Sequence, residues 1–250
     1  MGKNKLRKFD EVNQLNNVIQ YTFKDGLPDS SGHELQCEWS RRLFANENPL
    51  VLELGCGKGE YTVELGRLFP ETNFIGVDIK GARIWKGAKD ADSSNISNVV
   101  FLRTRIEFIN FFFGKNEVDE IWLTFPDPQM KKDSKRLTSS FFMKRYEAVL
   151  KPEGIIRLKT DSKFQYEYTK ALVAKNGLSV VEQYDNVYTQ AHDTILTDIK
   201  TYYEKQWLDR GITIKYISFR LDKKGIDWQE PNVEIEPDEY RSFGRSAKDL

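Results

Sequence analysis

The stretch that decides the fold spans residues 51–59 and reads Val-Leu-Glu-Leu-Gly-Cys-Gly-Lys-Gly. It begins as an apolar strand and ends in three alternating glycines, Gly55, Gly57 and Gly59, where backbone can approach a ligand closely. A second apolar run, residues 74–77, ends at Asp78. An acid about 20 residues beyond such a loop holds paired ribose hydroxyls in nucleoside-binding folds. The pattern therefore predicts a site for a cofactor that contains a nucleoside.

The glycine spacing and the acid before it narrow the type of cofactor. Gly-x-Gly-x-Gly is neither the dinucleotide fingerprint nor a P-loop, so a pyrophosphate ligand is disfavoured. Glu53 would repel phosphate, whereas it suits a ligand that carries an ammonium and a sulfonium group. Residues 53–59 thus resemble motif I of the class I S-adenosylmethionine-dependent methyltransferases. Glycines near a strand also occur as ordinary turns, so further motifs must decide.

Length and composition describe an ordinary globular protein. The 250 residues are 39% hydrophobic, and lysine plus arginine equal aspartate plus glutamate at 38 each. One domain is expected, and binding of nucleic acid would need a local basic patch. Two cysteines and two isolated histidines indicate neither a disulfide framework nor a metal site. No apolar run is long enough to span a bilayer, and we expect a cytoplasmic protein, monomeric or homodimeric.

From residue 50 onward, short β-rich runs alternate with helical patterns. The expected strands are residues 51–54, 74–77, 99–103, 120–124, 155–159, 179–183 and 213–220. The expected helices are residues 61–68, 82–91, 106–113, 139–150 and 164–175, with residues 151–154 as a turn. This alternation predicts an α/β, Rossmann-like fold with a mostly parallel central sheet and helices on both faces.

The same pattern divides the chain into three parts. Residues 1–49 are expected to form an N-terminal extension with a helix near residues 34–44 and a mobile start over the first ten residues. Residues 50–220 form the main domain. Residues 221–250 mix prolines with alternating charges and are expected to be a largely irregular tail.

A second constellation follows the fourth expected strand. Residues 125–136 read Phe-Pro-Asp-Pro-Gln-Met-Lys-Lys-Asp-Ser-Lys-Arg, and two prolines restrict the backbone around Asp127. We call the four cations of this loop the basic cluster: Lys131, Lys132, Lys135 and Arg136. This loop and the glycine loop should meet where the topology of the sheet reverses. The pattern predicts a carboxylate facing a base and cations facing phosphates, although a proline-rich turn before a solvated helix has the same appearance.

Phe-Pro-Asp-Pro followed by Lys131 closely resembles the signature loop of the bacterial tRNA (guanine-N7)-methyltransferase family. Lys159-Thr160-Asp161 and Thr201-Tyr202-Tyr203-Glu204 resemble two further motifs of that family, and the resemblance spans residues 50–220. Four motifs in one order are far more specific than any single one. The resemblance implies a class I methyltransferase fold with an antiparallel last strand, S-adenosylmethionine as cofactor, and methyl transfer to N7 of a variable-loop guanosine in tRNA.

The resemblance also implies roles for single residues. The candidate cofactor contacts are Glu53, Gly55, Gly57, Gly59, Asp78, Arg105 and Asp127. The candidate substrate contacts are Lys131, Asp161, Thr201, Tyr202, Tyr203 and Glu204. Asp127, between cofactor and base, is the candidate catalytic residue. Three departures leave contacts open: Gln129 replaces a tryptophan, the segment 132–135 lacks an Arg-His pair, and Arg105 replaces an acidic or amide residue.

The implied chemistry needs little from the protein. Guanine N7 has a lone pair and no proton, so transfer requires positioning and electrostatic stabilisation rather than a general base. A carboxylate of Asp161 or Glu204 could select guanine through its N1–H and N2 amine, although Glu204 could also be an exposed helical acid. Two alternatives stay open: a methyltransferase for a small molecule or protein, which the basic cluster disfavours, and a non-catalytic tRNA-binding subunit, which the glycine loop and Asp127 disfavour.

Overall fold

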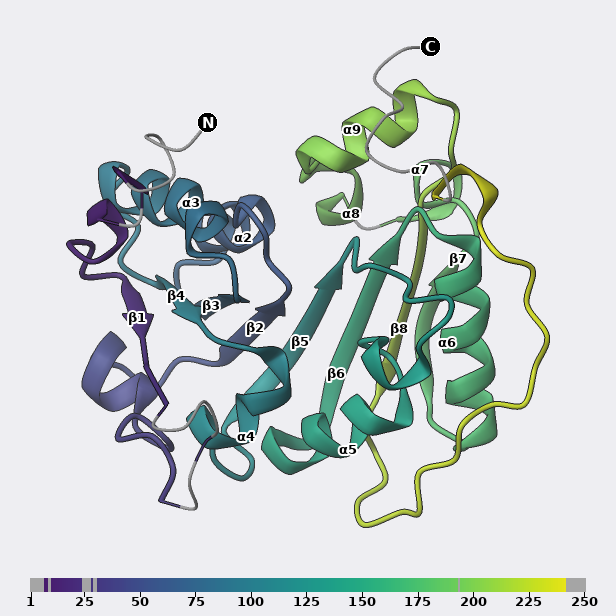
Figure 1. The fold of residues 1–250 in the computed structure, drawn as a ribbon, viewed down its shortest axis with the longest axis horizontal. Helices are drawn as coiled ribbons and strands as arrows, with labels where there is room; N and C mark the ends of the chain where they lie inside the picture. The colour runs from purple at the N-terminus through teal and green to yellow at the C-terminus, as the bar shows by residue number, and fades with distance from the viewer. Residues whose placement is uncertain (1–6, 9, 24–27, 29–30, 193, 242–250) are drawn as a thin grey trace.

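The computed structural model describes residues 7–8, 10–23, 28, 31–192 and 194–241. The strands in these residues form one eight-stranded sheet in the order β1-β4-β3-β2-β5-β6-β8-β7 (Figure 1). The strands are β1 (Val18–Gln20), β2 (Leu50–Leu54), β3 (Asn73–Asp78), β4 (Val99–Arg103), β5 (Val118–Thr124), β6 (Leu150–Thr160), β7 (Val180–Tyr184) and β8 (Lys215–Arg220). Only β8 runs antiparallel to its two neighbours among these strands. The expected mostly parallel sheet with an antiparallel last strand is confirmed.

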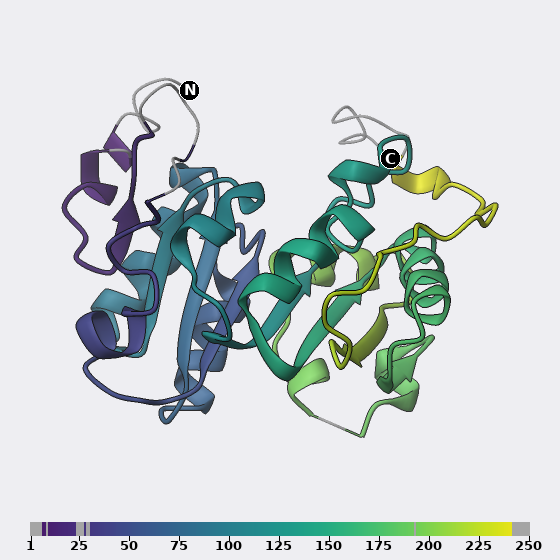
Figure 2. The same ribbon diagram turned by 90° about the horizontal axis from the view of Figure 1, so that it is seen from below.

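Helices cover both faces of the sheet (Figures 1 and 2). The α-helices are α2 (Glu60–Leu68), α3 (Gly81–Ser93), α4 (Ile109–Phe112), α5 (Ser140–Val149), α6 (Lys163–Lys175), α7 (Val187–Gln190), α8 (Ile195–Asp198) and α9 (Tyr202–Asp209). One buried apolar cluster joins the sheet to α4, α5 and α6, and a second joins it to α2, α3, α7 and α8. The sheet therefore has a hydrophobic core on each face, as a doubly covered parallel sheet requires.

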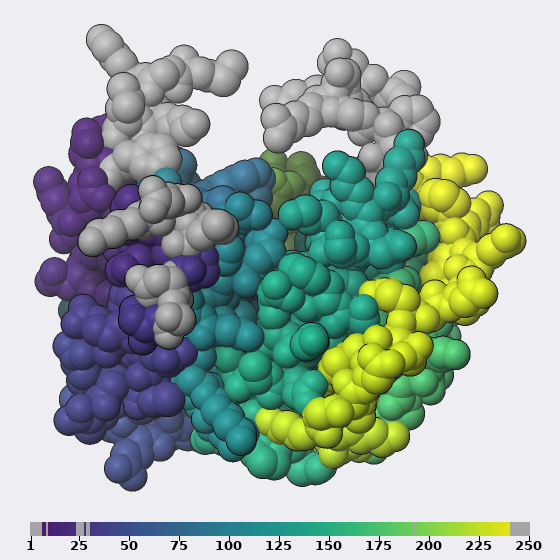
Figure 3. All heavy atoms as spheres, turned by 60° about the horizontal axis from the view of Figure 1, so that its bottom comes forward, coloured from purple at the N-terminus to yellow at the C-terminus, as the bar shows by residue number. Residues whose placement is uncertain are grey.

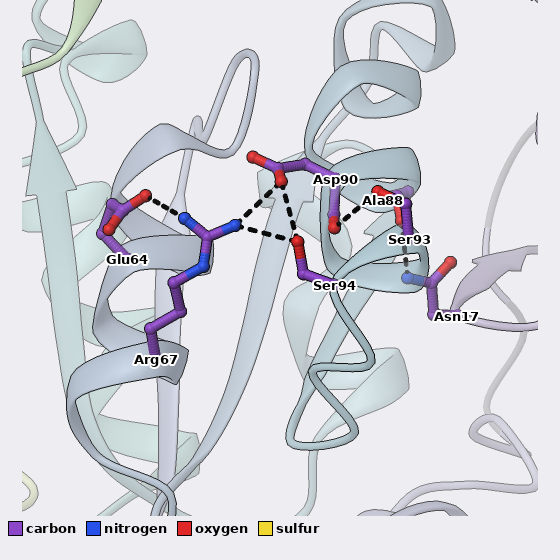
Figure 4. Close-up of polar contacts among 7 residues, drawn as sticks. All are labelled: Asn17, Glu64, Arg67, Ala88, Asp90, Ser93 and Ser94. Atoms are coloured by element: carbon purple, nitrogen blue, oxygen red, sulfur yellow. Dashed lines mark hydrogen bonds and ion pairs between the residues drawn. The ribbon is translucent and has the colours of Figure 1, made fainter.

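The two helices that follow the glycine loop and β3 are joined on their surface by one arginine (Figure 4). Arg67 of α2 binds Glu64 Oε1 at 2.6 Å within its own helix, and it reaches across to Asp90 Oδ1 of α3 at 2.8 Å. Asn17 donates to a main-chain carbonyl of α3 at 2.9 Å and so fastens the segment before β1. Such exposed ion pairs stabilise a fold by about 1 kcal/mol at most, so the buried clusters dominate.

The N-terminal part is more closely integrated than its sequence indicates. The three residues of β1 pair in parallel with β4 at the edge of the sheet, and no strand is predicted there. In place of a helix over 34–44, the structure has a π-helix over Trp39–Phe44, with the indole of Trp39 fully buried. Residues 1–6 and 9 lie outside the described residues, so the mobile start stays a prediction.

Two differences concern later elements. The expected turn at residues 151–154 lies within β6, in a break of its pairing with β5: Leu150 pairs with Val118 and Ile155 pairs with Glu120, and Glu153 between them has a φ of 64°. The short helices α7, α8 and α9 fill a stretch for which the sequence predicts no element. No helix of the described chain is long and apolar enough to cross a bilayer.

Residues 222–241, which we call the C-terminal strap, run along the outside of the molecule, as the yellow spheres in Figure 3 show. They are irregular apart from a 3-10 turn at Glu239–Arg241, as the sequence predicts. Trp228 donates to Glu147 Oε2 of α5 at 2.7 Å, and Gln229 exchanges two hydrogen bonds of 2.9 Å with Asn176 at the end of α6. The strap is therefore fixed to both helices.

Candidate active site

A cavity of about 520 Å³ opens at the carboxyl ends of the parallel strands. Its walls come from the loops after β2, β3, β4 and β5, and β2 and β5 are neighbours at the point where the strand order reverses. It brings together four of the predicted cofactor contacts, Gly55, Asp78, Arg105 and Asp127. A larger hollow of about 670 Å³ lies between α6 and the C-terminal strap, and no predicted site residue lines it. The reversal point is where open α/β sheets bind ligands.

The glycines of the loop have different structural roles. All three have a positive φ, between 58° and 80°, which side chains rarely tolerate. A Cβ on Gly55 would project into the cavity, with the nearest atoms 3.8 and 4.0 Å away on its far wall. A Cβ on Gly59 would lie 2.5 Å from the ring of Phe101. Gly55 thus opens the site to a ligand, whereas Gly59 allows α2 to pack on the sheet.

Asp78 both orders the glycine loop and faces the cavity. Its Oδ2 accepts a hydrogen bond from the Gly57 N–H at 3.0 Å, and its Oδ1 accepts one from the Lys80 N–H at 2.7 Å. The side chain is largely buried at the cavity wall. Each carboxylate oxygen has two lone pairs, so acceptor capacity remains for a pair of ligand hydroxyls.

Glu53 lies beneath the glycine loop and does not line the cavity. Its buried carboxylate accepts hydrogen bonds from the Thr62 N–H at 2.9 Å and from the hydroxyls of Thr62 and Thr124. Burial raises the pKa of Glu53 to about 7, and the hydrogen bonds only partly oppose this shift. A cation bound above the loop would favour the ionised form of Glu53.

Thr104 is a cavity residue that sequence analysis missed. Its Oγ1 is buried at the cavity wall, and within the described part of the chain it has no hydrogen-bond partner. Buried polar atoms in proteins nearly always have a partner, so this hydroxyl fits a polar ligand atom. The one sequence feature that could have indicated a site residue here is the position of Thr104 directly after the expected strand at residues 99–103.

The loop after β5 holds Asp127 in a constrained backbone. Phe125 and Gln129 on either side of it have φ values of 50° and 47°, in the left-handed region that residues other than glycine seldom adopt. Asp127 Oδ1 accepts a hydrogen bond from the Gln129 N–H at 3.0 Å, and the side chain is exposed at the cavity mouth. Such conformations concentrate at functional sites, where the surrounding structure holds them.

Arg136 fastens this loop from inside. Its guanidinium is 1% exposed, donates to the carbonyls of Pro128 and Gln129 at 3.0 and 3.1 Å, and lies 3.9 Å from the ring centre of Tyr168. The prediction that Arg136 contacts phosphate is therefore wrong. The other three cations of the cluster are exposed, so the prediction stays open for Lys131, Lys132 and Lys135.

Two cations at the rim of the cavity share one carboxylate. Glu107 Oε1 lies 3.2 Å from Arg105 and 3.3 Å from Lys135, and all three residues line the cavity. Burial alone would raise the pKa of Glu107, but its hydrogen bonds and these cations lower it overall. Glu107 thus links the wall after β4, including the unassigned Arg105, to the loop that carries the basic cluster.

The motif at residues 201–204 starts α9, and its glutamate points inward. Thr201 Oγ1 accepts a hydrogen bond from the Glu204 N–H at 3.1 Å and so caps the helix. Glu204 is fully buried, with Oε1 at 2.6 Å from Lys159 Nζ and at 2.8 Å from the Tyr188 hydroxyl. The alternative that Glu204 is an exposed helical acid is wrong, and the residue does not line the cavity.

The tyrosines of the same motif face outward beside the glycine loop. The main-chain N–H of Tyr202 donates to Glu60 Oε2 at 3.0 Å, and Lys58 Nζ lies 4.1 Å above the Tyr202 ring. Tyr202 and Tyr203 are 49% and 46% exposed, so both rings are open to a partner. Asp161, by contrast, is 1% exposed and accepts a hydrogen bond from Tyr240 at 2.8 Å.

Comparison with known proteins places this site in a family. A family profile described as "Putative methyltransferase" matches residues 47–217. A tRNA (guanine-N(7)-)-methyltransferase of Bacteroides thetaiotaomicron is 53% identical over 99% of this chain and 97% of its own length. The chain belongs to the tRNA (guanine-N(7)-)-methyltransferase family. A family member from Porphyromonas gingivalis is 55% identical over 92% of this chain and 95% of its own.

Solved structures show the same fold at low sequence identity. The 16S rRNA methyltransferase KamB has a TM-score of 0.56 at 14% identity and covers 72% of this chain and 91% of its own. A structure described as an antibiotic-related methyltransferase has a TM-score of 0.55 at 19% identity, over 78% of this chain and 98% of its own. These similarities concern the fold, and the expected class I methyltransferase fold is confirmed.

Proposed function

We propose that this protein transfers the methyl group of S-adenosylmethionine to N7 of a guanosine in tRNA, and that this guanosine lies in the variable loop. The observation that carries the proposal is the cavity at the reversal point of the sheet, where Asp78 and Asp127 line the same space in a chain 53% identical to a named family member. The proposal makes tRNA the partner of the protein and the cytoplasm its place of action.

The residues of the cavity fit the cofactor. Asp78 would accept the ribose hydroxyls, Thr104 would supply its unused hydroxyl, and Gly55 would let the main chain lie against the ligand. Bound S-adenosylmethionine would supply the methyl group on a positively charged sulfur. Glu53, beneath the glycine loop, would favour that charge in its ionised form.

Asp127 has a positioning and electrostatic role in this proposal. It lies at the cavity mouth in a loop fixed by two prolines and by Arg136, so its carboxylate is preorganised. Because N7 carries no proton, the residue does not act as a base; it stabilises the positive charge that develops on the purine. The three exposed lysines of the basic cluster, Lys131, Lys132 and Lys135, would hold the phosphates of the tRNA.

One assay separates this proposal from its two alternatives. Unmodified tRNA is incubated with the protein and methyl-labelled S-adenosylmethionine, and the product is digested with nuclease and mapped. We expect 7-methylguanosine from the variable loop. Label on a small molecule or protein alone would favour the first alternative, and binding of tRNA without transfer would favour the non-catalytic subunit. Label at another guanosine would contradict only the variable-loop assignment.

We expect Asp78→Ala to weaken the binding of S-adenosylhomocysteine by about 2–3 kcal/mol, because the ligand hydroxyls would no longer have a charged acceptor. Calorimetric titration measures this change. Asp90→Ala is the matched control, since that carboxylate lies on the surface between α2 and α3 and should leave the dissociation constant unchanged. An unaltered affinity in a folded Asp78→Ala protein would remove this residue from the cofactor site.

Neutralising the exposed part of the basic cluster should weaken tRNA binding and reduce its salt dependence. Each lysine that no longer binds a phosphate should lower the slope of log K against log salt by roughly 0.7–0.9, because fewer counterions are released. The test variant replaces three residues by glutamine: Lys131, Lys132 and Lys135. The control makes the same charge change at three exposed lysines outside the cavity: Lys115, Lys144 and Lys175. Equal slopes in the two variants would show that the cluster is only a solvated surface.

A further inference from the structure

The end of the C-terminal strap meets three segments that the family resemblance assigns to the substrate: the loop after β5, Asp161, and α9, which begins with the motif at residues 201–204. The Asp238 N–H lies 3.2 Å from the sulfur of Met130 in the loop that carries Asp127. The Tyr240 hydroxyl donates to Asp161 Oδ2 at 2.8 Å, and the Tyr240 ring packs edge-on against Trp207 of α9 with centres 5.4 Å apart. Residues 238–240 thus touch all three of these segments.

Asp238 fixes the strap at this point. Its carboxylate accepts hydrogen bonds from the Ser162 hydroxyl and, at 3.1 Å, from the Phe164 N–H at the start of α6. Ser162 itself caps that helix, with its Oγ accepting from the Gln165 N–H at 2.9 Å. Asp238 is 6% exposed, whereas the residues on either side of it are exposed. The helix dipole favours a carboxylate at the first turn of a helix. Asp238 therefore stabilises the attachment of the strap to the start of α6.

Tyr240 in turn contacts the carboxylate of Asp161. Asp161 is 1% exposed and follows β6 directly, at the same edge of the sheet as the cavity. A buried carboxylate needs hydrogen-bond donors, and the phenol of Tyr240 supplies one from the strap. One hydrogen bond of the Asp161 carboxylate therefore comes from a residue beyond residue 217, where the match to the family profile ends.

We propose that Asp238 and Tyr240 are positioning residues for tRNA. They hold the Asp161 carboxylate, the loop of Asp127 and α9 in the relative arrangement in which the substrate guanosine binds. The strap is an integral part of the substrate site and not an appendage. The inference rests on the proposed function, because the substrate contacts that it organises are those of the tRNA site.

The test compares three variants by steady-state kinetics with tRNA varied at saturating S-adenosylmethionine. Tyr240→Phe removes one hydroxyl, and we expect the KM for tRNA to rise roughly tenfold, as for the loss of one hydrogen bond to a charged group, with kcat within about twofold of wild type. Asp238→Asn should give a KM increase in the same direction. The dissociation constant of S-adenosylhomocysteine should stay unchanged in both.

Trp228→Phe is the matched control. It also removes one hydrogen bond of the strap, to Glu147, but at the opposite end from Asp161, and should leave the KM for tRNA unchanged. Thermal unfolding of all three proteins shows whether their stabilities are comparable.

Three outcomes would overturn the inference: a wild-type KM in Tyr240→Phe, an equal KM increase in Trp228→Phe, or a parallel loss of cofactor affinity. Each would mean that the strap supports the fold without positioning the substrate. Failure of the wild-type protein to methylate tRNA at guanine N7 would refute the proposed function itself, and the inference with it. The two failures are distinguishable because only the second is visible before any variant is made.

Discussion

Glu204→Leu is expected to lower the free energy of unfolding by about 3–5 kcal/mol, because it leaves the ammonium group of Lys159 buried without its counter-ion. Both side chains are fully buried. Burial raises the pKa of Glu204 and lowers the pKa of Lys159, and their mutual attraction only partly offsets these shifts. Each charge therefore depends on the other. Urea denaturation at neutral pH without ligand measures the loss.

The double variant Lys159→Met/Glu204→Leu provides the control. Replacing both members of a buried ion pair by apolar residues of similar size is often neutral or stabilising, so most of the stability should return. A single variant that loses less than about 1 kcal/mol, the scale of an exposed pair, would show that water reaches the pair. A double variant as unstable as the single one would assign the loss to packing instead of charge.

Asp127→Ala is expected to slow methyl transfer by about 10² to 10³, the usual effect of removing one preorganised electrostatic group from an active site. Asp127→Asn should be less damaging, because it keeps a hydrogen-bond acceptor at the same place and loses only the charge. Single-turnover methylation at saturating cofactor and tRNA, from pH 6 to 9, measures both.

Asp133→Ala is the control for this experiment, since its carboxylate lies in the same loop but does not line the cavity, and its ion pair with Arg136 is exposed on the Asp133 side. Near-wild-type rates in Asp127→Ala would remove the residue from the site. A rate that follows a titrating group and is restored by added carboxylate buffer would instead show that Asp127 acts as a base.

The sequence predicts those parts of the fold that have a local signal. The strands β2, β3 and β4 are apolar runs that end in loops, and each begins and ends within one residue of its predicted bounds. The three residues of β1 have no such pattern; they are a strand only because they pair with β4 far along the chain. The start of β6 has the pattern of a turn at Pro152 and Gly154, and its pairing with β5 is interrupted there; the strand includes this segment only because Leu150, before the interruption, pairs with Val118 far along the chain.

The site divides in the same way. Gly55, Asp78 and Asp127 are predicted because glycines, prolines and acids at strand ends have a local geometric meaning. By contrast, tertiary packing decides which charged side chains are buried, and the local sequence contains no pattern that predicts this. Arg136 looks like a phosphate ligand until the ring of Tyr168 and the carbonyls of its own loop enclose it. Thr104 likewise becomes a candidate only when its hydroxyl is seen to lie at the cavity wall.

The position of β8 between β6 and β7 has a consequence for synthesis on the ribosome. Both neighbours are translated before β8, so the nascent chain exposes the open edge of β6, and β7 has no strand to pair with. Open edges of this kind invite pairing with other chains. The sheet closes only when β8 inserts between two strands already made, which is a non-local and therefore slow step. We therefore expect nascent and newly released chains to be more prone to aggregation than the folded protein.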